Sequence, residues 1–198
     1  MYRKIALKLT NLFVEKRIIL KDKQDIYAYG FEMMISSFVY FGIFIFFAAI
    51  TNTIFQSLLF WMGLFISRKI TGGHHANSYI SCHILFAINH IICILLVKIT
   101  PSLILYEMTL SMLVITLISV FLFAPVDHKN KRFIKNEYKR YKFLSKVYSV
   151  ALTLILILFL IKIIPTNTFF YAYSIGIFSA AISLLCGKIY NFERNQKQ

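Results

Sequence analysis

The sequence predicts an all-α polytopic membrane protein with about six membrane-embedded helices, some short or re-entrant, and an N-terminal amphipathic helix at the membrane interface. Hydrophobic residues make up 59% of the 198 residues, against about 45–50% in a typical soluble domain. Charged residues make up only 15%, and the mean hydropathy is +0.70. This composition excludes the soluble globular, coiled-coil and disordered classes. The apolar residues form long runs without alternation, which indicates helices rather than strands.

Residues 1–25 are expected to form the amphipathic helix. Its apolar side chains recur at the three-and-four spacing of one helix face: Tyr2, Ile5, Ala6, Leu9, Leu12 and Phe13. Basic side chains fall mostly on the rest of the helical wheel, and the polar run at residues 21–25 ends the segment. Residues 1–23 hold seven Lys and Arg residues and no uninterrupted apolar run, so we expect no cleavable signal peptide.

Six apolar runs follow, at residues 32–50, 53–67, 80–97, 101–124, 147–164 and 167–187. A helix needs about 20 residues to cross the hydrocarbon core. We therefore expect one or both of the second and third runs to be short, tilted or only partly spanning. The whole chain, residues 1–198, is predicted to be one membrane domain, with a helical core at 26–187 and a basic cytoplasmic loop at 126–146.

The distribution of basic residues predicts the topology. If residues 1–30 are cytoplasmic and all six runs cross, 20 of the 22 Lys and Arg residues face the cytoplasm. Only Lys98 and Lys162 then lie near the outer face, as the positive-inside rule requires. Both termini are predicted to be cytoplasmic. Bases that flank apolar spans indicate contact with anionic membrane lipid, so we expect no nucleic-acid partner.

The segment at residues 68–83 is the most unusual part of the chain, because ten of its residues, 74–83, include three of the five histidines and one of the three cysteines. Gly72-Gly73 can break the preceding helix and expose backbone amides. One continuous helix would separate His75 from Cys82 by about 10.5 Å. A cooperating pair therefore needs His75 before a helix that carries Cys82 in its first turn, where a thiolate is favoured. Histidine would then act as the base of a cysteine nucleophile.

Two other interpretations of this segment stay open on the residues alone. Zinc could bind four side chains of suitable type: His74, His75, Cys82 and His83. Adjacent histidines rarely point at one ion, however, and no acidic residue lies nearby. Alternatively, Cys82 packs as a small hydrophobic residue beside a polar interfacial loop. The chain has three cysteines and no CxxC motif, so we expect free thiols rather than a disulfide framework: Cys82, Cys93 and Cys186.

For the whole protein, the alternative to an enzyme is a small polytopic transporter or channel without covalent catalysis. Proton and ion pathways usually need several ionisable groups within the spans. His90 is the only such group deep within the apolar runs, which argues against transport. A non-catalytic membrane scaffold for a partner is a third interpretation.

The pattern R-x(4)-G-x-H-A-x(5)-C, made by Arg68, Gly73, His75-Ala76 and Cys82, resembles the active-site signature of the AgrB family of accessory gene regulator proteins. The similarity extends to the basic N-terminus, to residues 29–32 and to residues 124–131. It implies a membrane-embedded cysteine endopeptidase of Gram-positive bacteria. Such an enzyme cleaves an AgrD-type propeptide in quorum sensing and supports its cyclisation to a thiolactone or lactone peptide.

The resemblance also implies residue roles, with Cys82 as nucleophile and His75 as general base. Arg68 and Gly73 match positions that the family needs, without an assigned role. From the chemistry, backbone amides around Gly72-Gly73 are candidate oxyanion donors, with Arg68 as an alternative.

Charged residues elsewhere in the chain are candidates for supporting roles. Glu32 and Asp127 lie at cytoplasmic span ends and are candidates to orient the base. The basic loop either contacts anionic lipid or binds the acidic C-terminal part of the propeptide through Lys129, Lys131 and Arg132. A homodimer is expected from the resemblance, and we expect no metal or other cofactor.

Overall fold

The computed structural model describes residues 2–73, 79–126 and 135–196. Within these ranges all regular elements are helices, and they are connected by short turns. Their bounds are α1 (Tyr2–Glu15), η1 (Lys21–Lys23), α2 (Gln24–Ile50), α3 (Ile54–Thr71), α4 (Tyr79–Ile99), η2 (Ser102–Ile104), α5 (Leu105–Phe123), α6 (Lys135–Leu160) and α7 (Thr168–Gln196). The predicted fold class is confirmed.

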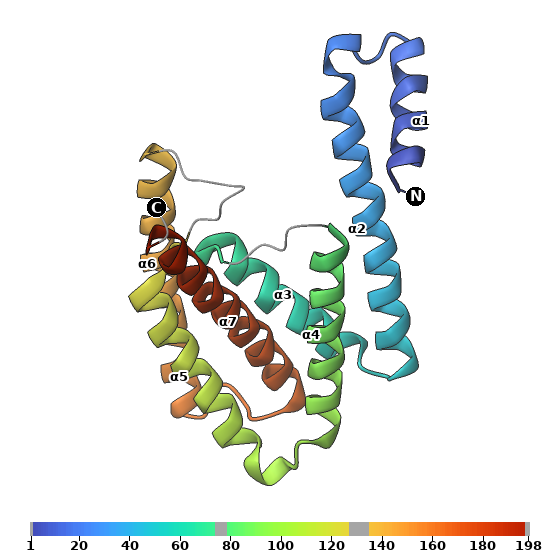
Figure 1. The fold of residues 1–198 in the computed structure, drawn as a ribbon. Coiled ribbons are helices and arrows are strands. Elements are labelled where there is room, and N and C mark those ends of the chain that lie inside the picture. The colour runs from blue at the N-terminus through green and yellow to red at the C-terminus, as the bar shows by residue number, and fades with distance from the viewer. Residues whose placement is uncertain (1, 74–78, 127–134, 197–198) are drawn as a thin grey trace.

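Helices α2 to α7 run alternately between the two ends of the molecule (Figure 1). Five of the described helices are long and apolar enough to cross a membrane, namely α2, α4, α5, α6 and α7. α3 is not among them, because its 18 residues end in a polar turn that contains Arg68 and Lys69. The second predicted run is therefore the short one, whereas α4 has the length of a full span.

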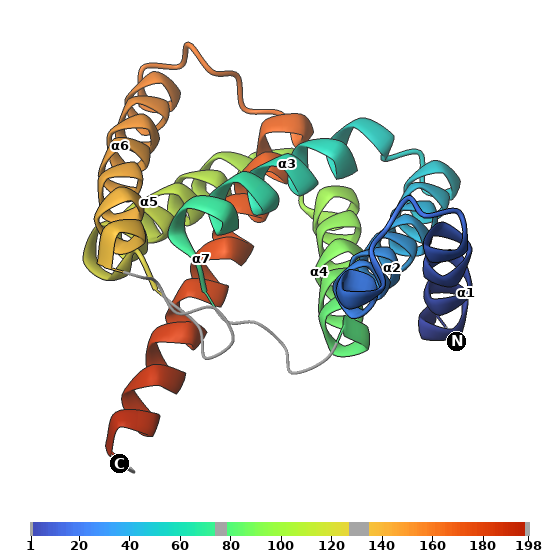
Figure 2. The same ribbon diagram turned by 90° about the horizontal axis from the view of Figure 1, so that it is seen from above.

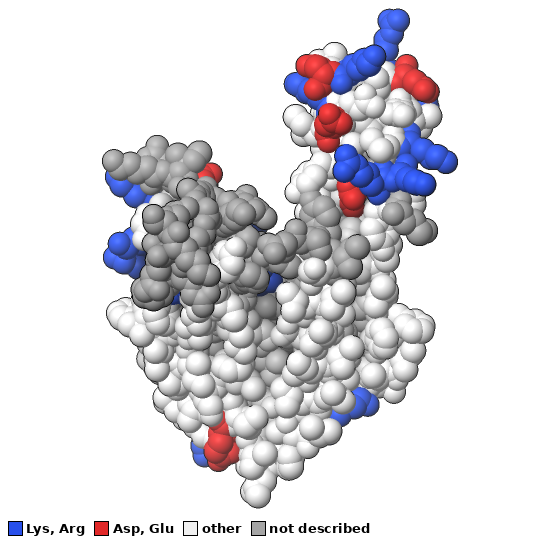
Figure 3. Space-filling model, in the orientation of Figure 1, with Lys and Arg blue, Asp and Glu red and all other residues white. Residues whose placement is uncertain are grey.

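Charged side chains gather at the two ends of the molecule, with an uncharged band between them (Figure 3). Most Lys and Arg side chains in this view lie over α1, the start of α2 and the start of α6, and few lie at the opposite end. This separation is the one that the positive-inside rule requires of a six-crossing chain. Which end faces the cytoplasm stays a prediction.

The N-terminal helix α1 runs antiparallel to the first half of α2 (Figure 1). Ala6 and Thr10 are buried, and the Phe13 and Phe31 rings stack with centroids 5.5 Å apart. Other members of the predicted apolar face, Ile5 and Leu12, stay exposed. α1 is shorter than the predicted segment because the helix ends at Glu15 and a turn follows. Its apolar stripe is thus divided between packing on α2 and an outward face.

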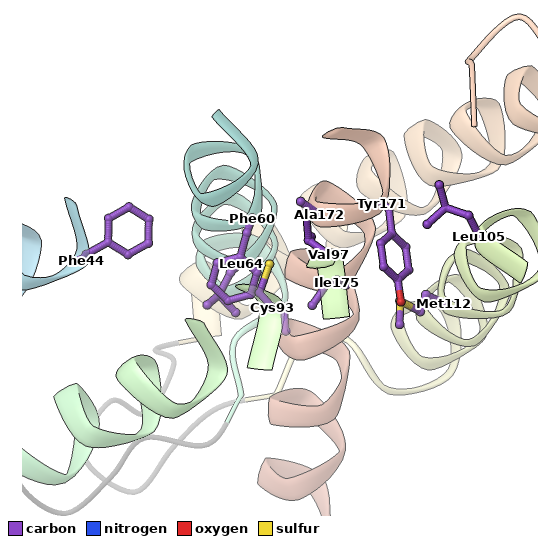
Figure 4. Packing of buried hydrophobic residues seen from close by; sticks show 11 residues of the cluster. Phe44, Phe60, Leu64, Cys93, Val97, Leu105, Met112, Tyr171, Ala172 and Ile175 are labelled. Carbon is purple, nitrogen blue, oxygen red and sulfur yellow. The ribbon is translucent and has the colours of Figure 1, made fainter. Parts of the chain in front are cut away.

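Two glycines allow α3 and α7 to pack backbone to backbone at the centre of the bundle (Figure 2). A Cβ atom on Gly63 would lie 2.7 Å from the Tyr173 carbonyl oxygen, and one on Gly176 would collide with the Phe60 carbonyl oxygen. Small residues permit such close approach in membrane helix pairs. Around this crossing, side chains of α3, α4 and α7 form one buried cluster (Figure 4). The crossing fixes the direction of the last turn of α3.

His90 is buried in the same cluster and makes polar contacts inside it. Its Nε2 atom lies 2.8 Å from the Ser57 hydroxyl oxygen, and its ring stacks on Phe44 with centroids 4.1 Å apart. A buried polar side chain needs such a partner. His90 therefore joins α2, α3 and α4.

The basic segment predicted as a loop over residues 126–146 is helical from Lys135 onward, so the loop prediction was wrong for its second half. The Tyr148 hydroxyl lies 2.5 Å from the Ser67 hydroxyl, and the Ser145 hydroxyl donates to the Ile70 carbonyl at 3.4 Å. Hydropathy detects only the part of a helix that lies in the apolar layer. Lys, Arg and Glu are good helix formers, so α6 continues into its basic segment while its inner face contacts α3.

Candidate active site

Cys82 lies in the first turn of α4, where the sequence predicted it, and its side chain is half-buried. Phe86 follows one turn later on the same helix. The guanidinium carbon of Arg68, from the last turn of α3, lies 5.5 Å from the centre of the Phe86 ring. Such a contact between a cation and an aromatic face is attractive. It holds the Arg68 side chain alongside the α4 turn that carries the thiol.

One cavity of about 550 Å³ opens between α3, α4 and α7. Its polar lining comes from all three helices: Arg68, Cys82, Asn89, Ser179, Ser183 and Tyr190. The Cys186 thiol also lines it, opposite α4. This volume is in the range of small-molecule and peptide sites. We call it the α7-side cavity.

A second cavity of about 460 Å³ lies between α2, α3 and α4. Large apolar side chains dominate its lining: Met33, Met34, Phe38, Tyr40, Phe41, Trp61, Phe65 and Phe86. Within the described residues, no Asp, Glu, Lys or Arg lines it. We call it the α2-side cavity. Of the residues that the structure describes, only Cys82 and Phe86 line both cavities, so the thiol is accessible from two chemically different sides.

Gly72 and Gly73 turn the chain sharply after α3, with φ angles of 76° and 133° that favour glycine. Gly72 forms a parallel bridge with Val126, whose amide donates to the Thr71 carbonyl at 3.0 Å. A Cβ atom on Gly73 would lie 2.9 Å from the Ser183 hydroxyl oxygen. Because Ser183 lines the α7-side cavity, the chain leaves Gly73 beside the cavity that contains Cys82.

Arg68 supplies a formal charge at the site. Burial lowers the pKa of its guanidinium, and a thiolate at Cys82 would act in the opposite direction. Arginine nevertheless stays charged at any physiological pH. Among the described residues that line the two cavities, it is the only Lys, Arg, Asp or Glu. A negative charge that forms at Cys82 therefore has one formal countercharge among these lining residues.

Several predicted site residues fall outside the described part of the chain, where the structure says nothing of them: His74, His75, Asp127, Lys129, Lys131 and Arg132. Glu32 is described, on α2, and lines neither cavity. His83 hydrogen-bonds to Ser36 and stacks on Tyr40 with centroids 5.3 Å apart. These contacts make His83 part of the junction between α2 and α4.

The residues that α7 contributes to the α7-side cavity were not predicted from the sequence. Four of its cavity-lining residues lie on one face of the helix: Ser179, Ser183, Cys186 and Tyr190. Their spacing of four, three and four residues is a helical periodicity. That pattern could have indicated a polar-lined face. The partner helices that close the cavity could not be read from it.

Comparison with known proteins gives one family. Residues 6–184 match the family described as Accessory gene regulator B. Three curated sequences from Staphylococcus epidermidis, each called Accessory gene regulator protein B, are 36% identical to the chain over 99 residues. Each alignment covers 50% of this chain and 50% of the relative, so the chain spans about half the length of the curated relatives it matches. No solved structure matches the chain.

Proposed function

Because the chain belongs to the Accessory gene regulator B family, we propose that it is a membrane cysteine endopeptidase that cleaves and cyclises an AgrD-type propeptide. One observation carries the proposal most directly. The Cys82 thiol stands at the start of a helix, between two cavities, with the charged Arg68 beside it. A thiol that only packed as a small hydrophobic residue would not need access from two sides or a neighbouring cation.

Cys82 is the nucleophile. A thiolate is favoured at a helix N-terminus and next to a cation, and Cys82 has both features. The other two cysteines fit the role less well. Cys93 is 1% exposed in the core, and Cys186 lies in the interior of α7, far from a helix N-terminus.

His75 is the general base, and Asp127 is the residue that orients it. Gly73, two residues before His75 in the sequence, lies against Ser183, which lines the α7-side cavity. Asp127 directly follows Val126, which is bridged to Gly72. Glu32 has no comparable link to the site, so we favour Asp127 for the orienting role.

Arg68 stabilises the oxyanion that forms when the thiolate attacks the carbonyl. The Gly72 amide already donates to the Arg68 carbonyl at 3.0 Å, so it does not suit the role of donor. The role of the Gly72-Gly73 turn is then steric, because residues without a Cβ atom let the chain pack closely against Val126 and Ser183. A preorganised donor stabilises the charge of the transition state most strongly in a site that excludes water.

The reaction is two successive acyl transfers. The Cys82 thiol gives its proton to His75 as its sulfur attacks the scissile carbonyl, and the C–N bond breaks as His75 passes that proton to the leaving amine. The thiol or hydroxyl of a propeptide cysteine or serine then attacks the Cys82 thioester and closes the ring, and its proton returns through His75 to the Cys82 sulfur. Exchange of one thioester for another is nearly balanced in energy, so this step needs no ATP. The apolar α2-side cavity limits access of water to the thioester.

The two cavities suggest how the propeptide lies. The acyl side of the cleaved bond occupies the uncharged α2-side cavity, and the acidic leaving part lies on the side of the α7-side cavity. Lys129, Lys131 and Arg132 attract that acidic part. In this proposal the site is cytoplasmic, and the enzyme works as a homodimer.

The test is to trap the Cys82 thioester. Purified protein in lipid nanodiscs, mixed with a propeptide whose ring-closing cysteine is replaced by alanine, should gain the mass of the acyl fragment. Hydroxylamine should remove the added mass. The Cys93→Ala protein should form the same adduct, whereas Cys82→Ala should form none. An adduct of equal yield on Cys82→Ala would reject the proposal.

A further inference from the structure

A third cavity, of about 770 Å³, lies between α5 and α6, and neither Cys82 nor Arg68 lines it. α5 supplies an apolar wall that includes Leu117, Ile118 and Phe121. The facing wall from α6 is polar: Lys142, Ser145, Lys146, Ser149 and Thr153. The cavity is therefore an amphiphilic groove, with ammonium groups and hydroxyls on one side and apolar groups on the other. We call it the α5–α6 groove.

The groove has the length of one membrane leaflet. Its lining on α6 extends from Lys142 to Thr153, which is about 16 Å of helix rise. Half of a typical hydrocarbon core is about 15 Å. The two lysines lie in the first half of α6, and that helix begins at an end of the molecule where basic side chains gather (Figure 3). Phe121 and Val150 at its edge are 75% and 70% exposed, so the groove also opens sideways toward lipid.

We propose that the α5–α6 groove binds one anionic phospholipid. Its phosphate lies between Lys142 and Lys146, which share one helix face one turn apart, and an acyl chain lies against the α5 wall. Basic pockets between spanning helices recognise anionic headgroups in this way. No Asp or Glu is among the described residues that line the groove. A second copy of the chain is a poor occupant of the groove itself, because it would have to bring an acidic segment to the two lysines and has only 8 Asp and Glu residues against 22 Lys and Arg.

A lipid bound in the groove should also stabilise α3. The part of α6 that lines it also contacts α3, through the Tyr148–Ser67 hydroxyl pair at 2.5 Å and the Ser145–Ile70 hydrogen bond at 3.4 Å. A lipid that holds α6 in place therefore stabilises the last two turns of α3. Ligands that bind only the folded state raise its apparent stability. This inference does not depend on the proposed reaction.

The test measures phosphatidylglycerol binding by native mass spectrometry and by thermal unfolding, with phosphatidylcholine as the zwitterionic comparison. Replacing both groove lysines, in Lys142→Gln/Lys146→Gln, should weaken phosphatidylglycerol binding about 30-fold. Lys139→Gln/Arg140→Gln is the matched control, since it removes two charges from the same helix outside the groove lining. It should change binding less than about 3-fold. Equal losses in the two double variants would overturn the proposal.

Two further measurements separate a lipid in the groove from an anion on the surface. Ser149→Leu fills the groove without changing charge, and it should lose phosphatidylglycerol binding while its thermal unfolding in phosphatidylcholine stays cooperative. Water-soluble glycerophosphate, which has the headgroup but no acyl chains, should not stabilise the wild-type protein at the same concentration. Full lipid binding by Ser149→Leu, or equal stabilisation by glycerophosphate, would contradict a groove-bound lipid.

Discussion

Helices α2 and α7 form opposite walls of the space around Cys82, and they differ in how deeply they are embedded. In the most apolar 18-residue stretch of each helix, 17% of the residues are buried in α2 and 50% in α7. α7 packs on α3 through two glycines, whereas a Cβ atom on Gly42 of α2 would meet nothing within 4 Å. The α7 side is a fixed wall, and the α2 side is the wall that faces outward.

The chemistry of the two cavities follows the same division. The α7-side cavity contains the charged Arg68 and several polar groups, while the α2-side cavity is lined by aromatic and Met side chains. Preorganised electrostatic groups need rigid support to stabilise a transition state. Apolar binding surfaces tolerate adjustment, and exposed Met and aromatic side chains suit it. We therefore expect changes on the α7 side to reduce the rate of reaction, and changes on the α2 side to alter substrate binding.

The largest effect is expected at Cys82, which both cavities share. Cys82→Ala should lower propeptide cleavage by at least about 10³-fold, because no nucleophile is left. Cys82→Ser should be almost as inactive, since a hydroxyl is far less nucleophilic than a thiolate at neutral pH. Cleavage is followed by mass spectrometry of the released fragment. Cys93→Ala should cleave normally, and normal cleavage by Cys82→Ala would remove the basis of the comparison.

Arg68→Gln tests the α7 side. Loss of a charged oxyanion donor should lower kcat by about 10²–10³-fold, with little change in KM. Arg68→Lys should recover part of the rate, because it restores the charge without the planar guanidinium. Lys69→Gln is the neighbouring control, as Lys69 is exposed and lines neither cavity. If Arg68→Gln raised KM and left kcat intact, Arg68 would belong to substrate binding instead.

Glycine-to-alanine changes compare the packing of α7 and α2 directly. Gly176→Ala should destabilise the protein by about 1–3 kcal/mol, since its Cβ atom would collide with the Phe60 carbonyl oxygen. Gly42→Ala should stabilise α2 by about 0.5–1 kcal/mol, because alanine is the better helix former and has free space there. Thermal unfolding in one lipid mixture measures both. Equal shifts in the unfolding temperature of the two variants would show that α7 is not more tightly packed than α2.

The smallest effect is expected on the α2 side. Phe41→Ala removes one aromatic side chain from the cavity lining, and it should raise KM for the propeptide by about 10-fold while kcat changes less than about 3-fold. Phe46→Ala is the matched control, because Phe46 is on the same helix, is 61% exposed and does not line the cavity. A fall in kcat for Phe41→Ala with unchanged KM would place the α2 side in the chemical step.

The sequence predicted the fold class, the short second run and the helical first turn around Cys82 correctly. These features depend on hydropathy, on run length and on local helix signals, which all lie within short stretches of chain. The hydropathy pattern placed the start of this helix too late, at residue 147 instead of Lys135. A helix can extend beyond the apolar layer when contacts such as Tyr148–Ser67 support it. His75 and Asp127 lie outside the described residues, so their predicted roles stay predictions.

The sequence by itself determined that this is a helical membrane protein and that Arg68, Gly73 and Cys82 belong to one motif. Only the tertiary structure decided that Arg68 stacks on Phe86, that Gly73 meets Ser183, and that the thiol lies between two unlike cavities. The physical reason is the distance along the chain: Ser183 comes 101 residues after Cys82. Such contacts depend on how helices cross, and the crossing of α3 with α7 is fixed by close packing at Gly63 and Gly176.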